Sequence, residues 1–136
     1  MGYVNPDRSI LKKLKGAEKT FVQVLADGLS DAWFIFTRQD LWTKGRPYEI
    51  DVLLMHEKYG FLAMEVKGGP IRIEKGEWYR GDEHFTVSPI RQVQDAAYEL
   101  RDCLSEESLQ LEHVQIAHAV VFPDVLKLVG KLPPSC

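Results

Sequence analysis

Two apolar runs joined by a short turn constrain the fold of this chain most. Residues 48–55 and 61–67 are rich in Val, Leu, Ile and Met, and the "HEKYG" between them ends in a glycine suited to a turn. We therefore predict two antiparallel strands. Within these runs Asp51, Glu65 and Lys67 stand where a buried sheet favours apolar side chains.

A hairpin centred on Lys58 would bring the charged residues together. In an antiparallel pair the opposed residue numbers then add to 116, which sets Asp51 opposite Glu65 and Glu49 opposite Lys67. All four share one face because strand side chains alternate with period two. Opposed Cβ atoms lie about 5 Å apart, so two carboxylates can converge on one divalent cation. Without a cation or Lys67 nearby, burying both carboxylates would be costly.

A second interpretation places these charges on a solvated face. In it, Glu49 and Lys67 form an ordinary cross-strand ion pair on a sheet that is wet on one side. Under the same register, however, that face also carries four apolar residues: Leu53, Met55, Phe61 and Ala63. Polar groups gathered at one end of an apolar face indicate a site at the rim of a core. The pattern alone leaves both interpretations open.

The rest of the chain predicts a mixed α/β domain. In chain order we expect a helix over 17–29, a buried strand over 32–37, a polar loop over 38–47, the hairpin, short antiparallel strands at 71–74, 77–80 and 84–87, a helix over 89–104 and a strand over 115–122. Ser88 before Pro89 resembles an N-cap followed by proline in the first turn. Such an order favours a mixed sheet flanked by helices.

Length and charge narrow the function classes. A chain of 136 residues fits one domain, and its net charge of −3 argues against coating nucleic acid by bulk attraction. Residues 1–80 carry a net +2 and residues 81–136 a net −5, so we expect phosphate contacts in the first part. The basic residues there that group most densely are Lys12, Lys13, Lys15 and Lys19, followed by Arg38, Lys44 and Arg46.

The sequence lacks the signals of a membrane or secreted protein. No apolar run approaches the roughly 20 residues of a membrane span, and the N-terminal residues lack a secretory signal. The two cysteines, Cys103 and Cys136, predict neither a disulfide framework nor a metal site. We therefore expect a cytoplasmic location and no membrane partner. The four histidines are scattered without zinc-ligand spacing.

Several motifs in order along the chain resemble one family. "EIDVLL", "GFLAMEVKGGPI", "GEWYR", "SPIRQ" and "AVVFPD" are similar to segments of the nuclease-related domain, NERD, a branch of the PD-(D/E)xK nuclease superfamily. The resemblance runs from about Gly16 to Asp124 and implies a restriction-endonuclease-like αβββαβ core with extra small hairpins. It implies a domain over 16–136, a fragment of a longer protein, after an extension over 1–15. Copies at the N-terminus of helicase-like proteins are the most similar.

The resemblance also implies a set of site residues. Asp51 matches the first acidic position of the family, and Glu65 with Lys67 matches its E-x-K pair. By this likeness Mg²⁺ (or Mn²⁺) would be held by Asp51, Glu65 and the carbonyl of Val66. Glu18 matches an acidic residue of the first helix that often joins such sites, although Ala17 stands here where the family usually has glycine.

Two residues, Gln92 and Gln94, are candidates for a glutamine at the site. Gln92 matches the glutamine that follows Pro-x-x at the start of the second helix, whereas Gln94 and Tyr98 have a Q-x-x-x-Y spacing known in some relatives. Residues two apart on a helix face different ways, so we expect only one glutamine at the site and prefer Gln92.

These matches imply a Mg²⁺-dependent nuclease that cleaves DNA, in repair or processing, as part of a larger protein. The alternative is a nucleic-acid-binding or docking module that does not cleave and serves a helicase or kinase domain of the same chain. A third interpretation is an interaction domain with no nucleic-acid role. Trp42, Trp78 and Tyr79 flank basic residues and could stack on unpaired bases, but packing in the core is the simpler expectation.

Overall fold

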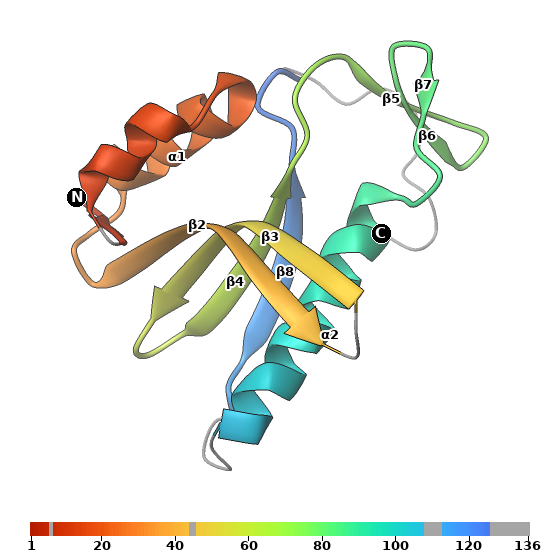
Figure 1. Ribbon diagram of the computed structural model, residues 1–136. Coiled ribbons are helices and arrows are strands. Elements are labelled where there is room, and N and C mark those ends of the chain that lie inside the picture. Colours follow the sequence, from red (N-terminus) through yellow and green to blue (C-terminus); the bar gives the residue numbers. More distant parts are fainter. Residues whose placement is uncertain (6, 44–45, 108–112, 126–136) are drawn as a thin grey trace.

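The computed structural model describes residues 1–5, 7–43, 46–107 and 113–125 (Figure 1). It contains a five-stranded mixed sheet of order β1-β2-β3-β4-β8. The strands are β1 (Tyr3–Val4), β2 (Trp33–Thr43), β3 (Arg46–His56), β4 (Gly60–Val66) and β8 (Ile116–Val121). The helices are the 3₁₀-helix η1 (Arg8–Lys13), α1 (Gly16–Gly28) and α2 (Pro89–Glu107). The predicted αβββαβ order and the mixed α/β class are confirmed.

α1 and α2 pack on opposite faces of the sheet (Figure 1). Because alternate strand residues project to opposite faces, Val52 and Met64 pack in the α1 layer, whereas Leu53 and Ala63 pack in the α2 layer. The buried core of the α1 layer consists of Val4, Leu11, Leu14, Val22, Ala26, Ile35, Val52, Leu54 and Met64. That of the α2 layer consists of Ile50, Leu53, Ala63, Val93, Ala96, Ala97 and Leu100.

The hairpin of β3 and β4 has the predicted register. His56 pairs with Gly60 and Leu53 with Ala63, so opposed residue numbers add to 116. The pairing continues to Val52 and Met64 but goes no further. On its other side β4 pairs in parallel with β8, up to its last residue, Val66. β3 therefore separates from β4 just before the charged positions.

The segment expected as a polar loop over 38–47 is largely strand, and this prediction was wrong. β2 continues to Thr43 and pairs with β3, but the pairing skips one position, between Thr37–Val52 and Gln39–Ile50. Arg38 lies at that gap with a φ of 49°, which non-glycine residues seldom adopt. The segment was predicted as a loop because many of its residues are polar, but it forms an extended strand with one unpaired position.

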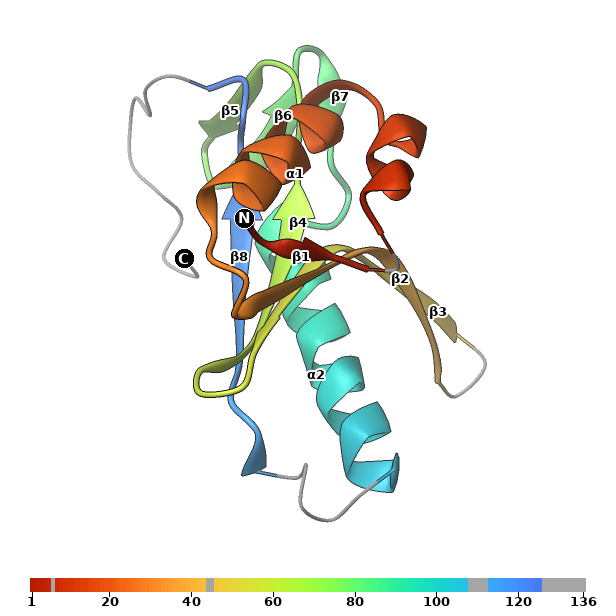
Figure 2. The same cartoon turned by 90° about the vertical axis from the view of Figure 1, so that its left-hand side faces the viewer.

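The first 15 residues, expected as an extension, contribute to the core. β1 lies beside β2 and pairs with it in parallel (Figure 2). Val4, Leu11 and Leu14 are buried in the α1 layer, and Gly2 N–H donates to the carbonyl of Ala26 at the end of α1. This segment therefore packs against the layer that carries α1.

A second, three-stranded antiparallel sheet follows β4. It consists of β5 (Ile71–Glu74), β6 (Glu77–Arg80) and β7 (Glu83–His84). The first two strands are as predicted, while the third is shorter than the expected 84–87. The chain leaves it to reach Ser88, whose Oγ accepts a hydrogen bond from Arg91 N–H at 3.1 Å. This confirms the N-cap that precedes Pro89.

Candidate active site

Asp51 lies where β3 and β4 separate. Its Oδ2 accepts a hydrogen bond from the backbone N–H of Val66 at 2.9 Å. The carboxylate thus takes the place of the β3 carbonyl that a continued ladder would supply. The N–H and C=O of one strand residue point to the same neighbouring strand, so the carbonyl of Val66 faces the same gap as Asp51.

Glu65 and Lys67 form a buried ion pair at the end of β4. Lys67 Nζ lies 3.1 Å from Glu65 Oε1, and the two side chains are 14% and 5% exposed. The pKa of Glu65 is raised to about 7, mainly by burial and also by the charge of Asp51, whereas the Lys67 ammonium acts to lower it. Because the charge of Asp51 acts on Glu65, the two carboxylates lie near each other.

Glu49 lies beside Asp51, and its expected ion pair with Lys67 is wrong. Its Cα partner is Asp40 of β2, and Lys67 pairs with Glu65 instead. Burial raises the pKa of Glu49, and the charges of Asp51 and Asp40 add to this effect. The register that would oppose Glu49 to Lys67 ends before it because β3 bends away from β4.

Glu18 and Arg38 connect α1 to the acidic residues. Glu18 lies in the first turn of α1, its side chain is 17% exposed, and its Oε1 is 3.3 Å from Arg38 Nε. Glu18 raises the pKa of Arg38 most, and Glu49 and Asp51 raise it as well. The guanidinium therefore lies in the field of three carboxylates. Arg38, one of the seven basic residues expected to contact phosphate, is thus engaged by acids of the protein.

The structure places Gln92 and Gln94 on different sides of α2, as expected. They are about 200° apart around the helix axis. Gln94 lines a surface cavity of about 190 Å³ between α2 and β8, and the other lining residues are Ala97, Tyr98, Arg101, Ile116 and His118. Gln92 is exposed in the first turn and donates its N–H to Ser88. No described contact joins Gln92 to Asp51 or Glu65.

Of the three aromatic residues that could stack on bases, the structure describes the side chains of two, Trp78 and Tyr79 of the small sheet. Trp78 is 4% exposed and stacks on Phe122, with ring centroids 5.7 Å apart. The ring of Tyr79 faces the guanidinium of Arg72, whose Cζ lies 4.4 Å from the ring centroid. Trp78 is thus a packing residue, while the side chain of Trp42 falls outside the part of the chain described.

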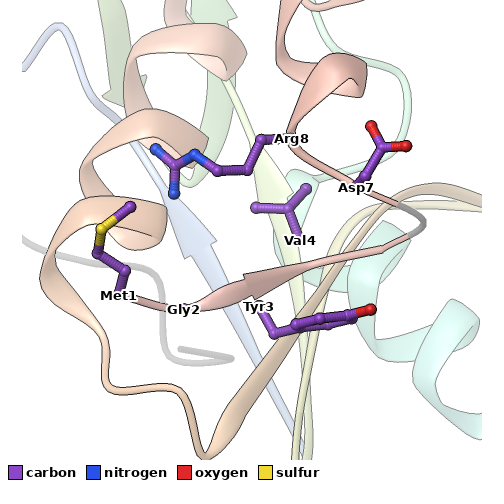
Figure 3. Close-up of a pocket in the computed structure, with 6 residues that line it drawn as sticks. All are labelled: Met1, Gly2, Tyr3, Val4, Asp7 and Arg8. Atoms are coloured by element: carbon purple, nitrogen blue, oxygen red, sulfur yellow. The ribbon is translucent and has the colours of Figure 1, made fainter.

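A larger cavity, of about 240 Å³, lies near the N-terminus (Figure 3). It is lined by Met1, Gly2, Tyr3, Val4, Asp7 and Arg8. Arg8 reaches Asp27 of α1 at 2.9 Å, so its charge is already partnered. None of the acids near the β3–β4 separation lines this cavity, so the larger hollow and the candidate chemistry are in different places.

The donor set at the β3–β4 separation suits a hard divalent cation. Carboxylate and carbonyl oxygens are the ligands that Mg²⁺ prefers. Burial and the charge of Asp51 raise the pKa of Glu65, and a bound cation would favour its ionised form. Within residues 1–5, 7–43, 46–107 and 113–125, no three His, Cys, Asp or Glu side chains converge as a metal site. A cation here would therefore rest on two carboxylates with the carbonyl of Val66.

One comparison with known proteins shows the family of the chain. Residues 13–123 match the family model of NERD, the nuclease-related domain. The chain belongs to the nuclease-related domain family. Comparison with curated proteins and with solved structures gave no match. Among the described residues of this nuclease-related domain, no helix is long and apolar enough to cross a membrane.

Sequence reasoning missed the aromatic neighbour of Lys67. The Lys67 ammonium lies 5.3 Å from the ring centroid of Phe85, and the guanidinium of Arg80 lies 5.3 Å from the same centroid. Arg80 is the last residue of β6, and Phe85 directly follows β7. The alternating pattern predicted these strands but carried no signal of what they approach.

Proposed function

We propose that this nuclease-related domain is a metal-dependent nuclease that hydrolyses DNA phosphodiester bonds. The observation that carries the proposal is the buried Glu65–Lys67 pair at 3.1 Å beside Asp51. Acids and an amine buried together at the open end of a hairpin cost stability. Such an arrangement is typical of a site that handles charged substrates and not of a structural core.

Mg²⁺ or Mn²⁺ would be held by Asp51, Glu65 and the carbonyl of Val66, and once bound it would supply a Lewis acid and an activated water. Glu18 stands further back, where its ion pair with Arg38 fixes the guanidinium next to the acids. Asp51 also ties its carboxylate to Val66 N–H. This bond orients the carboxylate before any ligand arrives.

Lys67 is the electrostatic residue of the proposal. Its ammonium is largely buried and held on one side by Glu65 and on another by the Phe85 ring. A preorganised cation in a site of low dielectric stabilises negative charge that develops on a phosphate. Gln92, exposed at the start of α2, would contact the substrate. Catalytic roles are thus proposed for Asp51, Glu65, Lys67 and Gln92.

A wider setting follows from the same proposal. The domain would act on DNA in repair or processing, in the cytoplasm, within a longer polypeptide that carries a helicase or kinase domain. The similarity of "HAVVFPD" to copies in helicase-like proteins supports this setting.

The direct ion pair between Lys67 and Glu65 favours a second candidate. An amine already bound to the carboxylate competes with any cation for that ligand. The second candidate is therefore a domain that binds nucleic acid or docks a helicase or kinase domain without cleaving.

Cleavage assays on purified protein decide between them. Circular and linear DNA, single- and double-stranded, is incubated with Mg²⁺, with Mn²⁺ and with chelator, and the products are separated on gels. We expect cleavage only with metal, and a loss of about 100-fold or more in rate for Asp51→Asn and Lys67→Ala. Lys75→Ala, in the turn after β5, is the matched control and should cleave normally. Wild-type protein that binds DNA but cuts none of these substrates would favour the second candidate.

A further inference from the structure

We infer that Arg80 is a further substrate-binding residue, which holds a phosphate of the nucleic-acid strand beside the one at Lys67. This inference rests on the proposed function because it takes DNA as the substrate. It assigns the task of binding the DNA backbone to the small sheet, which contributes none of the proposed catalytic residues.

Arg80 and Lys67 share one aromatic ring. Each cationic group lies 5.3 Å from the centroid of Phe85, so the two cations are no farther apart than twice that distance. Phe85 is held in place, since its N–H donates to the carbonyl of Trp78 at 3.0 Å. The ring therefore fixes a second positive charge close to the Glu65–Lys67 pair.

The small sheet is anchored so that Arg80 faces the active centre. Trp78 and Arg80 are two apart on β6 and project to the same side, and Trp78 is buried against Phe122 just after β8. The small sheet lies beyond the ends toward which β4 and β8 point (Figure 1). Because Trp78 packs against Phe122, the side of β6 that carries Arg80 faces the ends of β4 and β8.

Backbone pairing ties Arg80 to the segment that follows Lys67. Arg80 pairs with Ile71, and Gly81 N–H donates to the carbonyl of Pro70 at 3.1 Å. The stem of Arg80 packs beside Gly69, where an added Cβ would lie 3.5 Å from its Cγ and Cδ. Only two residues separate Lys67 from Pro70, so both cations are held on one connected piece of backbone.

The guanidinium of Arg80 lacks an anionic partner in the described part of the chain. Its Nε is buried without a hydrogen-bond acceptor. Among the residues that the structure describes, no carboxylate lies within ion-pair distance of it. A buried, unsatisfied donor is costly unless a ligand supplies the acceptor. Arg72, on the opposite side of the same sheet, stacks on Tyr79, bonds the carbonyl of Gly81 and lies 3.5 Å from Glu74.

The missing acceptor has the chemistry of a phosphodiester. A guanidinium fork binds phosphate oxygens in a bidentate manner, and arginine is the preferred residue for this contact. A DNA strand that places one phosphate at Lys67 offers further phosphates along its backbone. Arg80 is the nearby cation with donors left to bind one.

DNA binding by wild type, Arg80→Gln, Arg80→Lys and Arg72→Gln tests the inference. Gln keeps much of the stem beside Gly69 and removes the charge. Fluorescence anisotropy with a labelled oligonucleotide, in chelator and across a salt series, measures affinity without cleavage. We expect Arg80→Gln to bind about tenfold more weakly and to reduce the salt slope by about one phosphate contact. Arg80→Lys should regain the slope, and Arg72→Gln should bind like wild type.

The outcomes separate this inference from the proposed function. If Arg80→Gln binds with wild-type affinity and slope while wild type cleaves DNA, the Arg80 assignment is overturned and the nuclease proposal stands. If binding depends on Arg80 but nothing is cleaved, the assignment stands and the nuclease proposal fails. Equal losses in Arg80→Gln and Arg72→Gln would also overturn it. Thermal melts by circular dichroism confirm that each variant is folded.

Discussion

At the scale of single residues, Glu65 shows what the site costs. It is 3% exposed in the middle of a sheet, where an ionised carboxylate is unfavourable. Lys67 offsets part of this cost, but burial and the charge of Asp51 outweigh it, so the pKa of Glu65 rises from an ordinary 4.5 to about 7. The residue therefore changes charge near neutral pH.

This titration predicts how stability depends on pH. Between pH 4.5 and 7 the folded protein binds more protons at Glu65 than the unfolded chain does, so the free energy of unfolding contributed by Glu65 falls as pH rises. Below pH 4.5 Glu65 is protonated in both states, and above pH 7 it is ionised in both. Glu65→Gln should therefore stabilise the protein at pH 8, by up to about 3 kcal/mol, and less at pH 5.

Urea unfolding of wild type and Glu65→Gln, in chelator at both pH values, measures this difference. Glu57→Gln, an exposed acid at the tip of the hairpin, is the control and should show no such dependence from burial. An equal stability difference between wild type and Glu65→Gln at pH 5 and pH 8 would mean that Glu65 does not titrate in this range.

At the scale of elements, the hairpin was predictable and the bend beside it was not. Alternation and the turn at Gly60 set the register of β3 and β4, so the sequence alone opposes Leu53 to Ala63. The separation of the strands beyond Val52 depends on β2, where Arg38 interrupts the pairing. Ile50 and Val52, two apart on β3, pack in opposite layers. The end of strand pairing at this point depends on tertiary packing, and the local sequence pattern does not predict it.

The same reasoning explains which site residues could be found. Asp51, Glu65 and Lys67 stood out because charge is unexpected in an apolar run. Arg80 belongs to a short alternating strand and Phe85 directly follows one, and polar and aromatic residues are ordinary there. Their approach to Lys67 depends on how the small sheet packs through Trp78 and Phe122, which sequence spacing does not encode.

The backbone at Arg38 can be tested by two substitutions. Arg38→Ala and Arg38→Gly both remove the ion pair with Glu18, but only glycine tolerates a φ of 49° without a steric cost. The glycine variant should therefore be more stable than the alanine variant, by about 1 kcal/mol. Thermal and urea unfolding measure the difference. An alanine variant of equal or greater stability would show that β2 straightens once the arginine is gone.

At the scale of the whole molecule, the candidate active site lies where separate parts of the fold meet. The main sheet opens between β3 and β4, α1 contributes Glu18, and the small sheet brings a second cation through Phe85. The charged side chains that meet there, those of Asp51, Glu65 and Lys67 among them, are not part of the two apolar layers. The chain thus separates a core that gives stability from an edge that gathers opposing charges.

A divalent cation should therefore stabilise the whole domain through Asp51. A ligand that binds only the folded state, at a hundredfold excess over its Kd, adds about 2.7 kcal/mol, which corresponds to roughly 10 °C in Tm for a domain of this size. We expect Mg²⁺ or Mn²⁺ to raise the Tm of wild type but not of Asp51→Asn. Asparagine keeps an oxygen that can accept from Val66 N–H and removes the charge that the cation needs.

Differential scanning calorimetry with and without cation measures the shift, with Glu57→Gln at the exposed tip of the hairpin as control. Glu57→Gln should shift as wild type does, because its carboxylate lies beyond the last residue of β3, six residues along the chain from Asp51. Equal shifts in wild type and Asp51→Asn would place the bound cation elsewhere. Because Lys67→Ala removes the amine that competes for Glu65, its shift should be at least as large as that of wild type, even though its cleavage is lost.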